Sequence, residues 1–251
     1  MRLELIFLLF SATIVHAQSA NFKEIRLRAK PAYFNPKDKY ATIIYPVIST
    51  KNSKIDKLIN AEIRNQILDA DETYPGVLKI LNSLSNDGLT DLLYEVTFNK
   101  NFILSFNIYT QYSGGAHLVD NTTYFNFDLS TGKKITVSDL FIQDKMDSFK
   151  QQILSNRQDS LKKYKMEELD LLRQKEVDSA TYEFAIEQIE NNYVSFDDFE
   201  RFIITKSSIE FIDKVQFPRI IRSQEPSYHL KYSLKTLATF LNLKYRKPLL
   251  K

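Results

Sequence analysis

The sequence predicts an α+β fold, with antiparallel sheets that carry helices on one face and two modules packed closely together. Three observations lead to this prediction. Segments with strand periodicity follow one another at short intervals, helical periodicity appears in separate segments, and the composition, 43% hydrophobic and 13% aromatic, is that of an ordinary globular protein. This arrangement differs from the regular strand and helix alternation of a parallel α/β protein.

The beginning of the chain predicts a secretory signal peptide over residues 1–17, cleaved before Gln18. Arg2 gives it a basic start, apolar residues follow, and the small residue Ala17 ends it. This apolar run is shorter than the roughly 20 residues that a membrane span needs, and no later run is long enough. We therefore expect an exported protein, periplasmic or extracellular, without a transmembrane helix after cleavage.

The charge balance and the missing cysteines exclude several classes of protein. The formal net charge is +3, and removal of Arg2 and Glu4 with the signal peptide leaves it unchanged. Such a balance argues against a dedicated nucleic-acid-binding protein, which gathers Lys and Arg on one face. A chain without cysteine has neither disulfides nor a thiolate metal site. We predict no cofactor and no metal.

A smaller N-terminal α+β module is predicted over residues 18–88. Its strands show alternating apolar residues or a β-branched and aromatic run, and its helix has apolar residues at spacings of three and four after a cap at Asn52 or Ser53. In order, we expect strands over 23–30 and 39–49, a helix from Ser53 to Leu68, and a segment over 69–88 whose structure is left unassigned.

A larger C-terminal module is predicted over residues 89–243, beginning with an antiparallel meander. The mixed-sign charges from Arg157 to Asp178 favour a solvated helical face. Residues 244–251 predict a loose basic tail. In order, we expect strands over 92–98, 102–112, 121–129 and 134–137, helical structure over 144–192, a hairpin of 199–205 with 209–215, a strand over 228–232 and a helix capped by Ser233.

The candidate site lies where the second strand of the meander leads into the third. The stretch Tyr112-Ser113-Gly114-Gly115-Ala116-His117 ends the most regular strand and contains two of the chain's five glycines. Glycine allows a positive φ or a close approach of backbone, so this stretch predicts a shaped loop over residues 112–120. The candidate binding residues are Tyr112, Ser113, Gly114, Gly115, His117 and Asp120.

No catalytic set stands out. Ser113, His117 and Asp120 are the residue types of a Ser–His hydrolase, but no G-x-S-x-G turn surrounds the serine. A zinc site would have to join His117 and His229 with carboxylates, and H-E-x-x-H is absent. Paired carboxylates for glycoside hydrolysis remain open because their spacing exists only in three dimensions. Glycan stacking also remains open, although core packing explains most of the Phe and Tyr residues better.

Several segments resemble a known family, a pair of exported domains of unknown function. These domains occur in the extracytoplasmic part of lysozyme-sensing anti-sigma factors of the RsiV type and beside the catalytic domain of peptidoglycan deacetylases. The similar segments are residues 112–117, Phe127-Asp128-Leu129-Ser130-Thr131-Gly132-Lys133, Leu140-Phe141, Tyr45-Pro46-Val47-Ile48 with Asn60, and Phe217-Pro218 with residues 228–241.

The resemblance implies a non-catalytic binding or sensing protein at the cell envelope. The deacetylase chemistry of the family belongs to a separate domain, and we expect no counterpart here of the sigma-binding segment and membrane helix of the anti-sigma factors. The expected ligand is a protein, lysozyme-like by analogy, or cell-wall peptidoglycan. The alternative function is a hydrolase of envelope glycan or peptide that uses His117.

Overall fold

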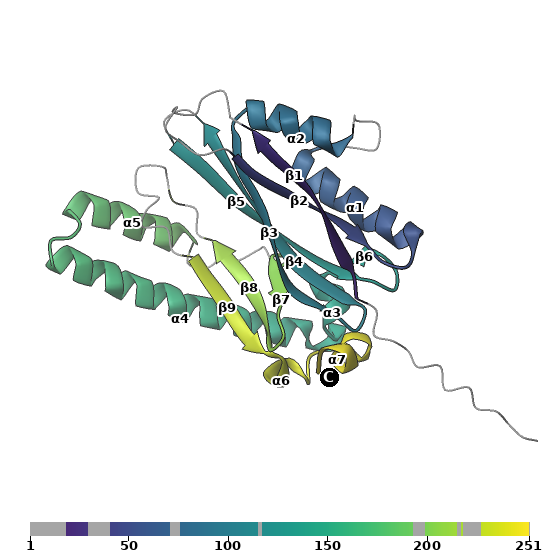
Figure 1. The fold of residues 1–251 in the computed structure, drawn as a ribbon. Coiled ribbons are helices and arrows are strands. Elements are labelled where there is room, and N and C mark those ends of the chain that lie inside the picture. The colour runs from purple at the N-terminus through teal and green to yellow at the C-terminus, as the bar shows by residue number, and fades with distance from the viewer. Residues whose placement is uncertain are drawn as a thin grey trace, which may run out of the picture.

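The computed structural model describes residues 19–29, 41–70, 76–114, 117–192, 199–214, 217 and 227–250, with the backbone alone at 29, 41, 114, 117, 192, 214, 227 and 228. The predicted signal peptide lies outside these residues. Two sheets with helices beside them confirm the predicted α+β class (Figure 1). Within the described ranges, no helix is long and apolar enough to cross a membrane.

The larger sheet contains six strands in the order of the sequence. Its pairings are antiparallel, which confirms the predicted meander, except that β2 and β3 pair in parallel over two residues each. The sheet continues across residue 88, the predicted module boundary, which falls just before β3. The strands are β1 (Asn21–Ala29), β2 (Ala41–Ser49), β3 (Leu89–Lys100), β4 (Ile103–Gly114), β5 (His117–Asp128) and β6 (Lys133–Lys134).

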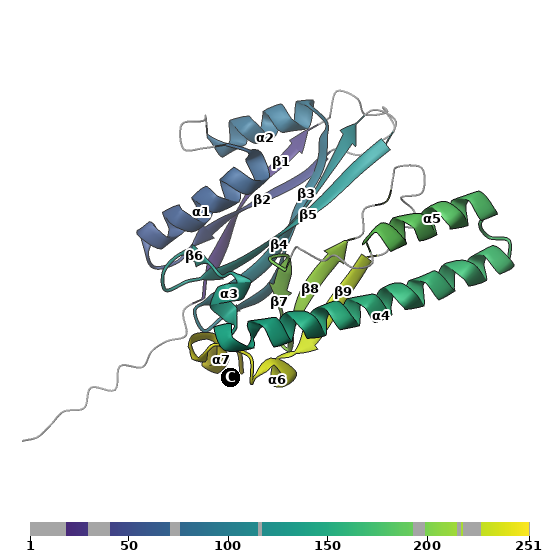
Figure 2. The same ribbon diagram turned by 180° about the vertical axis from the view of Figure 1, so that it is seen from behind.

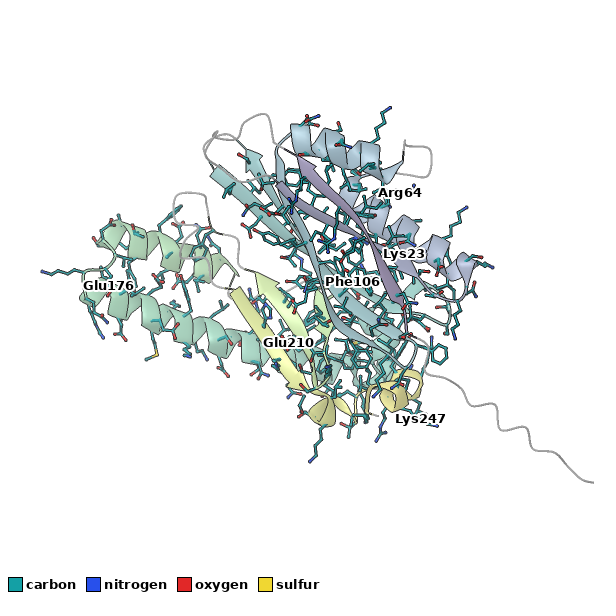
Figure 3. The ribbon with its side chains drawn as sticks, viewed as in Figure 1. Lys23, Arg64, Phe106, Glu176, Glu210 and Lys247 are labelled. Atoms are coloured by element: carbon teal, nitrogen blue, oxygen red, sulfur yellow. The ribbon has the colours of Figure 1, made fainter. Side chains whose placement is uncertain are left out.

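Helices α1 (Ser53–Leu68) and α2 (Val77–Asn86) cover one face of this sheet (Figure 1). The side chain of Asn52 accepts hydrogen bonds from the first N–H groups of α1, as the capping prediction expects. Helix α2 occupies part of the segment left unassigned. Between the helices and the sheet lies a core in which Phe106, at the centre of Figure 3, is fully buried together with Ile108.

Asn60 ties α1 to β2. Its Oδ1 accepts a hydrogen bond from Ile48 N at 2.7 Å, and its Nδ2 donates to Ile48 O at 2.7 Å and to Asp56 O at 2.8 Å. We expect Asn60→Asp to lower the free energy of unfolding by about 1–3 kcal/mol, because a carboxylate cannot donate to the two carbonyls. Chemical denaturation measures this loss. Asn65→Asp, at an exposed position of the same helix, is the control, and equal losses for both variants would contradict the prediction.

The smaller sheet, which contains β7 (Phe202–Ile204), β8 (Ser208–Lys214) and β9 (Ser227–Ser233), packs against the other face of the larger one. Its first two strands confirm the predicted hairpin around Ser207-Ser208. Polar side chains join the two sheets: Thr97 Oγ1 donates to Ile204 O at 2.7 Å, and Asn126 Nδ2 donates to Phe202 O at 2.8 Å. The sheets therefore contact each other through hydrogen bonds as well as apolar packing.

Most of the remaining helices lie beside the smaller sheet and form a second core with it (Figure 2). The predicted helical region over 144–192 is confirmed as two helices, α4 and α5, which lie side by side as an arm. The predicted cap Ser233 accepts a hydrogen bond from Thr236 N at 3.0 Å. The elements are α3 (Val137–Leu140), the short 3₁₀ helix η1 (Gln143–Lys145), α4 (Met146–Arg173), α5 (Ser179–Asn192), α6 (Leu234–Leu237) and α7 (Leu243–Leu250).

The charged stretch of α4 is not solvated throughout. Arg157 and Glu168 are only 2% and 3% exposed, and Arg157 Nε donates to Asp213 Oδ2 of β8 at 2.7 Å. The prediction of a solvated face was therefore wrong at these two positions. It failed because α4 packs against both β9 and α5, so charged side chains fall on its covered sides as well.

The predicted loose tail also has a fixed structure. Residues 243–250 form α7, in which Tyr245 and Leu249 are buried in the second core. Lys244 forms an ion pair with the buried carboxylate of Asp128. Burial alone would raise the pKa of Asp128, but hydrogen bonds from Lys244 and Ser130 hold it below its usual value. The prediction of a loose tail was wrong because two apolar residues four positions apart bury one side of a helix.

Candidate functional site

The stretch predicted as a loop is mostly the end of a β-hairpin made by β4 and β5. Tyr112 pairs with Val119, Ser113 with Leu118, and Gly114 with His117. The expected loop over 112–120 was therefore wrong in extent, because both strands continue through most of it. Gly115 and the side chains at 114 and 117 lie outside the described part of the chain.

Strand alternation separates the candidate residues onto two faces. Tyr112 packs against the core beneath α1 and α2, and burial raises its pKa. Ser113 and Asp120 are at positions of the opposite face, since they are one residue away from Tyr112 and its partner Val119. The structure thus groups Ser113 with Asp120 and places Tyr112 on the covered side.

Gly88 fixes the base of this hairpin end. Ser113 N donates to Gly88 O at 2.7 Å, and Gly88 has a φ of +110°. A Cβ atom at this glycine would lie 2.7 Å from Ser113 O. The close backbone approach seen beside this stretch therefore occurs at Gly88, which lies just before β3.

The face of β3, β4 and β5 that carries Asp120 presents three rows of side chains, and each row takes one residue from each strand. All nine residues are half-buried or exposed. We call these nine residues the open face. Its rows are Asp91 with Gln111 and Asp120, Leu93 with Tyr109 and Thr122, and Glu95 with Asn107 and Tyr124.

The open face ends where the smaller sheet begins. The next row, Phe98 with Ser105 and Asn126, is buried beneath β7. Ser105 Oγ accepts from Ile204 N at 2.9 Å and donates to Asn126 Oδ1 at 2.7 Å. The smaller sheet therefore covers this face only at its base, and the three rows nearer the hairpin end stay accessible.

Tyr109 is held at the centre of the open face by its neighbours. Thr90 Oγ1 donates to the backbone and side-chain oxygens of Gln111 at 3.0 and 3.3 Å, and Gln111 Nε2 donates to the Tyr109 hydroxyl at 2.8 Å. The phenol oxygen thus accepts a bond from within the protein, and its own O–H can donate outward. Burial and the negative charge of Asp120 raise the pKa of Tyr109, so the hydroxyl stays protonated at neutral pH.

Tyr124 lies at the base of the open face, near the cation of Arg201. Burial raises the pKa of Tyr124, and the charge of Arg201 opposes that rise. Asn107 separates Tyr124 from Glu95 in the same row. The open face therefore combines two tyrosines, two amides, a threonine, a leucine and three carboxylates.

The remaining histidine whose side chain is described belongs to another cluster, on the smaller sheet. Glu210 is labelled in Figure 3. His229 Nδ1 lies 3.4 Å from Glu210 Oε2, and Lys231 Nζ lies 2.8 Å from Glu210 Oε1. Burial would raise the pKa of Glu210, but its hydrogen bonds to Lys231, Ser208 and His229 hold it low. Among the described residues, no three His, Asp or Glu side chains gather as metal ligands.

Sequence reasoning identified Ser113 and Asp120 near this face but missed Tyr109, Tyr124 and Asn107. The signal for Tyr109 and Asn107 was present, because strict alternation in residues 102–110 assigns the even positions to the core and leaves 107 and 109 on the other face. The sequence could not show that β7 covers only the base of that face.

Comparisons with known proteins bear on the fold and on one segment. Residues 35–119 match the family model described as deacetylase PdaC. Among curated proteins, no significant match to this sequence was found.

Two crystal structures are similar in fold. A DUF3298 family member from Bacteroides fragilis NCTC 9343 superposes with a TM-score of 0.54 at 14% identity, covering 91% of this chain and 95% of that one. A DUF3298 family protein from Pseudomonas aeruginosa PAO1 gives 0.54 at 13% identity, covering 90% and 95%. At such identity the likeness concerns the fold, which extends over nearly the whole chain.

Proposed function

We propose that this protein is an exported, non-catalytic binding module of the cell envelope and that it holds its partner on the open face. The proposal rests on the accessibility of the open face, next to the end of the β4–β5 hairpin. A sheet face that the described elements leave partly exposed and that carries tyrosines and amides is typical of a recognition surface, because these side chains offer both contact area and hydrogen bonds.

The charges of the open face favour a basic protein as the partner. Asp91, Glu95 and Asp120 contribute three carboxylates, and none of the nine residues is a cation. Opposite charge across an interface speeds association and selects among partners. The resemblance to lysozyme-sensing anti-sigma factors makes lysozyme, a basic protein, the first probe.

Envelope glycan is a second candidate, favoured by the two tyrosines. Tyr109 and Tyr124 lie in adjacent rows on neighbouring strands, with Asn107 beside Tyr124. Aromatic rings can pack against sugar rings while hydroxyl and amide groups bond the sugar hydroxyls. The match to the family model described as deacetylase PdaC includes β3 and β4, two of the three strands of the open face.

The test measures binding of hen egg-white lysozyme and of purified peptidoglycan by residues 18–251. We expect Glu95→Lys with Asp120→Lys to weaken lysozyme binding at least about tenfold, since close interfacial charge pairs contribute about 1.5 kcal/mol or more. Wild-type affinity should also fall as ionic strength rises. For peptidoglycan, Tyr109→Ala should weaken binding by a similar factor.

Glu176→Lys is the matched control, because Glu176 is an exposed carboxylate at the far end of the arm (Figure 3). Its affinity for either probe should equal that of the wild type. Unchanged binding of both lysozyme and peptidoglycan after the open-face substitutions would contradict the proposed surface. Hydrolytic turnover that His117→Ala abolishes without affecting binding would contradict a non-catalytic function.

A further inference from the structure

A cavity lies on the other side of the larger sheet from the open face, between β2, α1 and the start of α2. Its volume is about 380 Å³, and its lining residues are Tyr45, Val47, Lys57, Asn60, Ala61, Arg64 and Val77. This side is the one that α1 and α2 cover, so the cavity is separate from the open face. It lies within the segment that matches the family model.

Arg64 brings an unsatisfied donor to this cavity. Its Nε is buried and has no hydrogen-bond partner among the residues that the structure describes, whereas the neighbouring amide of Asn60 is fully engaged with β2 and α1. A buried donor without a partner destabilises a protein, and the effect is larger for a charged group. Arg64 lies on α1 beside α2 (Figure 3). Its guanidinium is therefore suited to a bound anion.

The start of α2 adds a second attraction for an anion. Val77, the first residue of this ten-residue helix, lines the cavity. The N-cap is Gly76, which has no side chain to accept from the first N–H groups. The N–H groups and the dipole of a helix N-terminus favour negative charge.

Tyr45, the exposed Lys57 and three aliphatic residues make up the remaining walls. Tyr45 is 2% exposed, and burial raises its pKa while the nearby charge of Arg64 opposes the rise. Its hydroxyl is thus neutral and can donate. Val47, Ala61 and Val77 contribute small alkyl surfaces, which match a ligand that carries an aliphatic group next to its charge.

We infer that this cavity binds the carboxylate of a small ligand with an aliphatic flank, such as the C-terminal carboxylate of a short alanine-containing peptide. The planar guanidinium of Arg64 can donate two parallel hydrogen bonds to a carboxylate, and the Tyr45 hydroxyl can donate a third. The volume is in the range of small-molecule sites. This inference is independent of the function proposed for the open face.

The test compares three probes by calorimetry and thermal unfolding: acetyl-alanyl-alanine, its C-terminal amide and inorganic phosphate. We expect the free acid to bind and to raise the melting temperature, because a ligand of the folded state stabilises it. The amide should not bind, since it lacks the charge. Binding of phosphate but not of the peptide acid, or equal binding of acid and amide, would overturn the inference.

Variants of Arg64 test the assigned residue. Arg64→Gln should weaken binding of the peptide acid at least tenfold, whereas Arg173→Gln, at an exposed arginine of α4, should leave it unchanged. Arg64→Met should leave the melting temperature of the ligand-free protein equal to that of the wild type or raise it, because it removes an unpartnered buried donor. A clear loss of stability in Arg64→Met, or unchanged binding in Arg64→Gln, would show a structural role and overturn the assignment.

Discussion

Gly88→Val is expected to lower the free energy of unfolding by about 3–5 kcal/mol. Two costs combine at this position. A side chain at a φ of +110° strains the backbone by about 1–3 kcal/mol, and an atom placed 2.7 Å from Ser113 O forces the hairpin end away at a similar cost. For a chain of this length, the melting temperature should fall by about 10 °C, which differential scanning calorimetry measures.

Two further variants identify the cause. Gly88→Ala should already produce most of the loss, because both costs arise from the Cβ atom. Gly76→Ser is the matched control, since a Cβ atom at Gly76 meets nothing within 4 Å and serine can cap α2. Similar melting temperatures for Gly88→Val and Gly76→Ser would refute the argument.

Strand periodicity predicted the larger sheet well, and the reason is physical. Alternation decides which face of a strand is buried, and the apolar face of residues 102–110 indeed carries the fully buried Leu104, Phe106 and Ile108. The same pattern does not specify pairing partners far away in the chain. The parallel pairing of β2 with β3 and the contact of β7 with Asn126 depend on such distant partners.

Part of the family-like sequence signature has a structural explanation. Thr131-Gly132-Lys133 leads from the turn after β5 into β6, and here Gly132 N donates to Asp128 O at 2.7 Å and Gly132 has a φ of +75°. A Cβ atom at Gly132 would lie 3.3 Å from Ile55 Cα of α1. The contacts of Gly132 and the hydrogen bonds of Asn60 show that these residues of the family resemblance have structural roles. A resemblance on such residues therefore predicts the fold better than the ligand.

The candidate site was predictable only in part. Asp120 and Ser113 came from a stretch selected for its glycines, yet the tyrosines of the open face came from ordinary strand positions. Helical periodicity in α1 shows only that Arg64 lies away from the apolar positions. The cavity that Arg64 shares with Val77 could not be predicted, because the sequence left the segment of α2 unassigned.

Arg157→Met is expected to destabilise the protein by about 3–5 kcal/mol. The Arg157 and Asp213 side chains are 3% and 4% exposed, and their charged atoms lie 2.7 Å apart. Removing Arg157 leaves the buried Asp213 carboxylate without its ion-pair partner, with only the more distant charge of Arg201 to oppose the cost of burial. Chemical denaturation of the variant at neutral pH measures the loss.

The pH dependence of this variant follows from Asp213. Burial raises the pKa of Asp213 above its usual 3.8 even though the charge of Arg157 opposes the rise. Without Arg157 the pKa in the folded state rises further. An acid with a raised folded-state pKa binds more protons when folded, so stability falls as pH increases from 3.8 to the folded value. The stability of Arg157→Met should therefore be closer to that of the wild type at pH 4 than at pH 7.

Variants of Asp213 distinguish the effect of the buried charge on stability from the effect of packing. Asp213→Asn leaves a guanidinium that cannot be deprotonated and also removes the pH dependence that Asp213 gives the wild type, so its loss of stability should not increase from pH 4 to pH 7. Arg157→Met combined with Asp213→Leu removes both charges and keeps the volume filled, and such replacements are often neutral or stabilising. We expect the double variant to unfold within about 1 kcal/mol of the wild type. A double-variant loss equal to the sum of the single losses would mean that packing, rather than the uncompensated charge, is responsible.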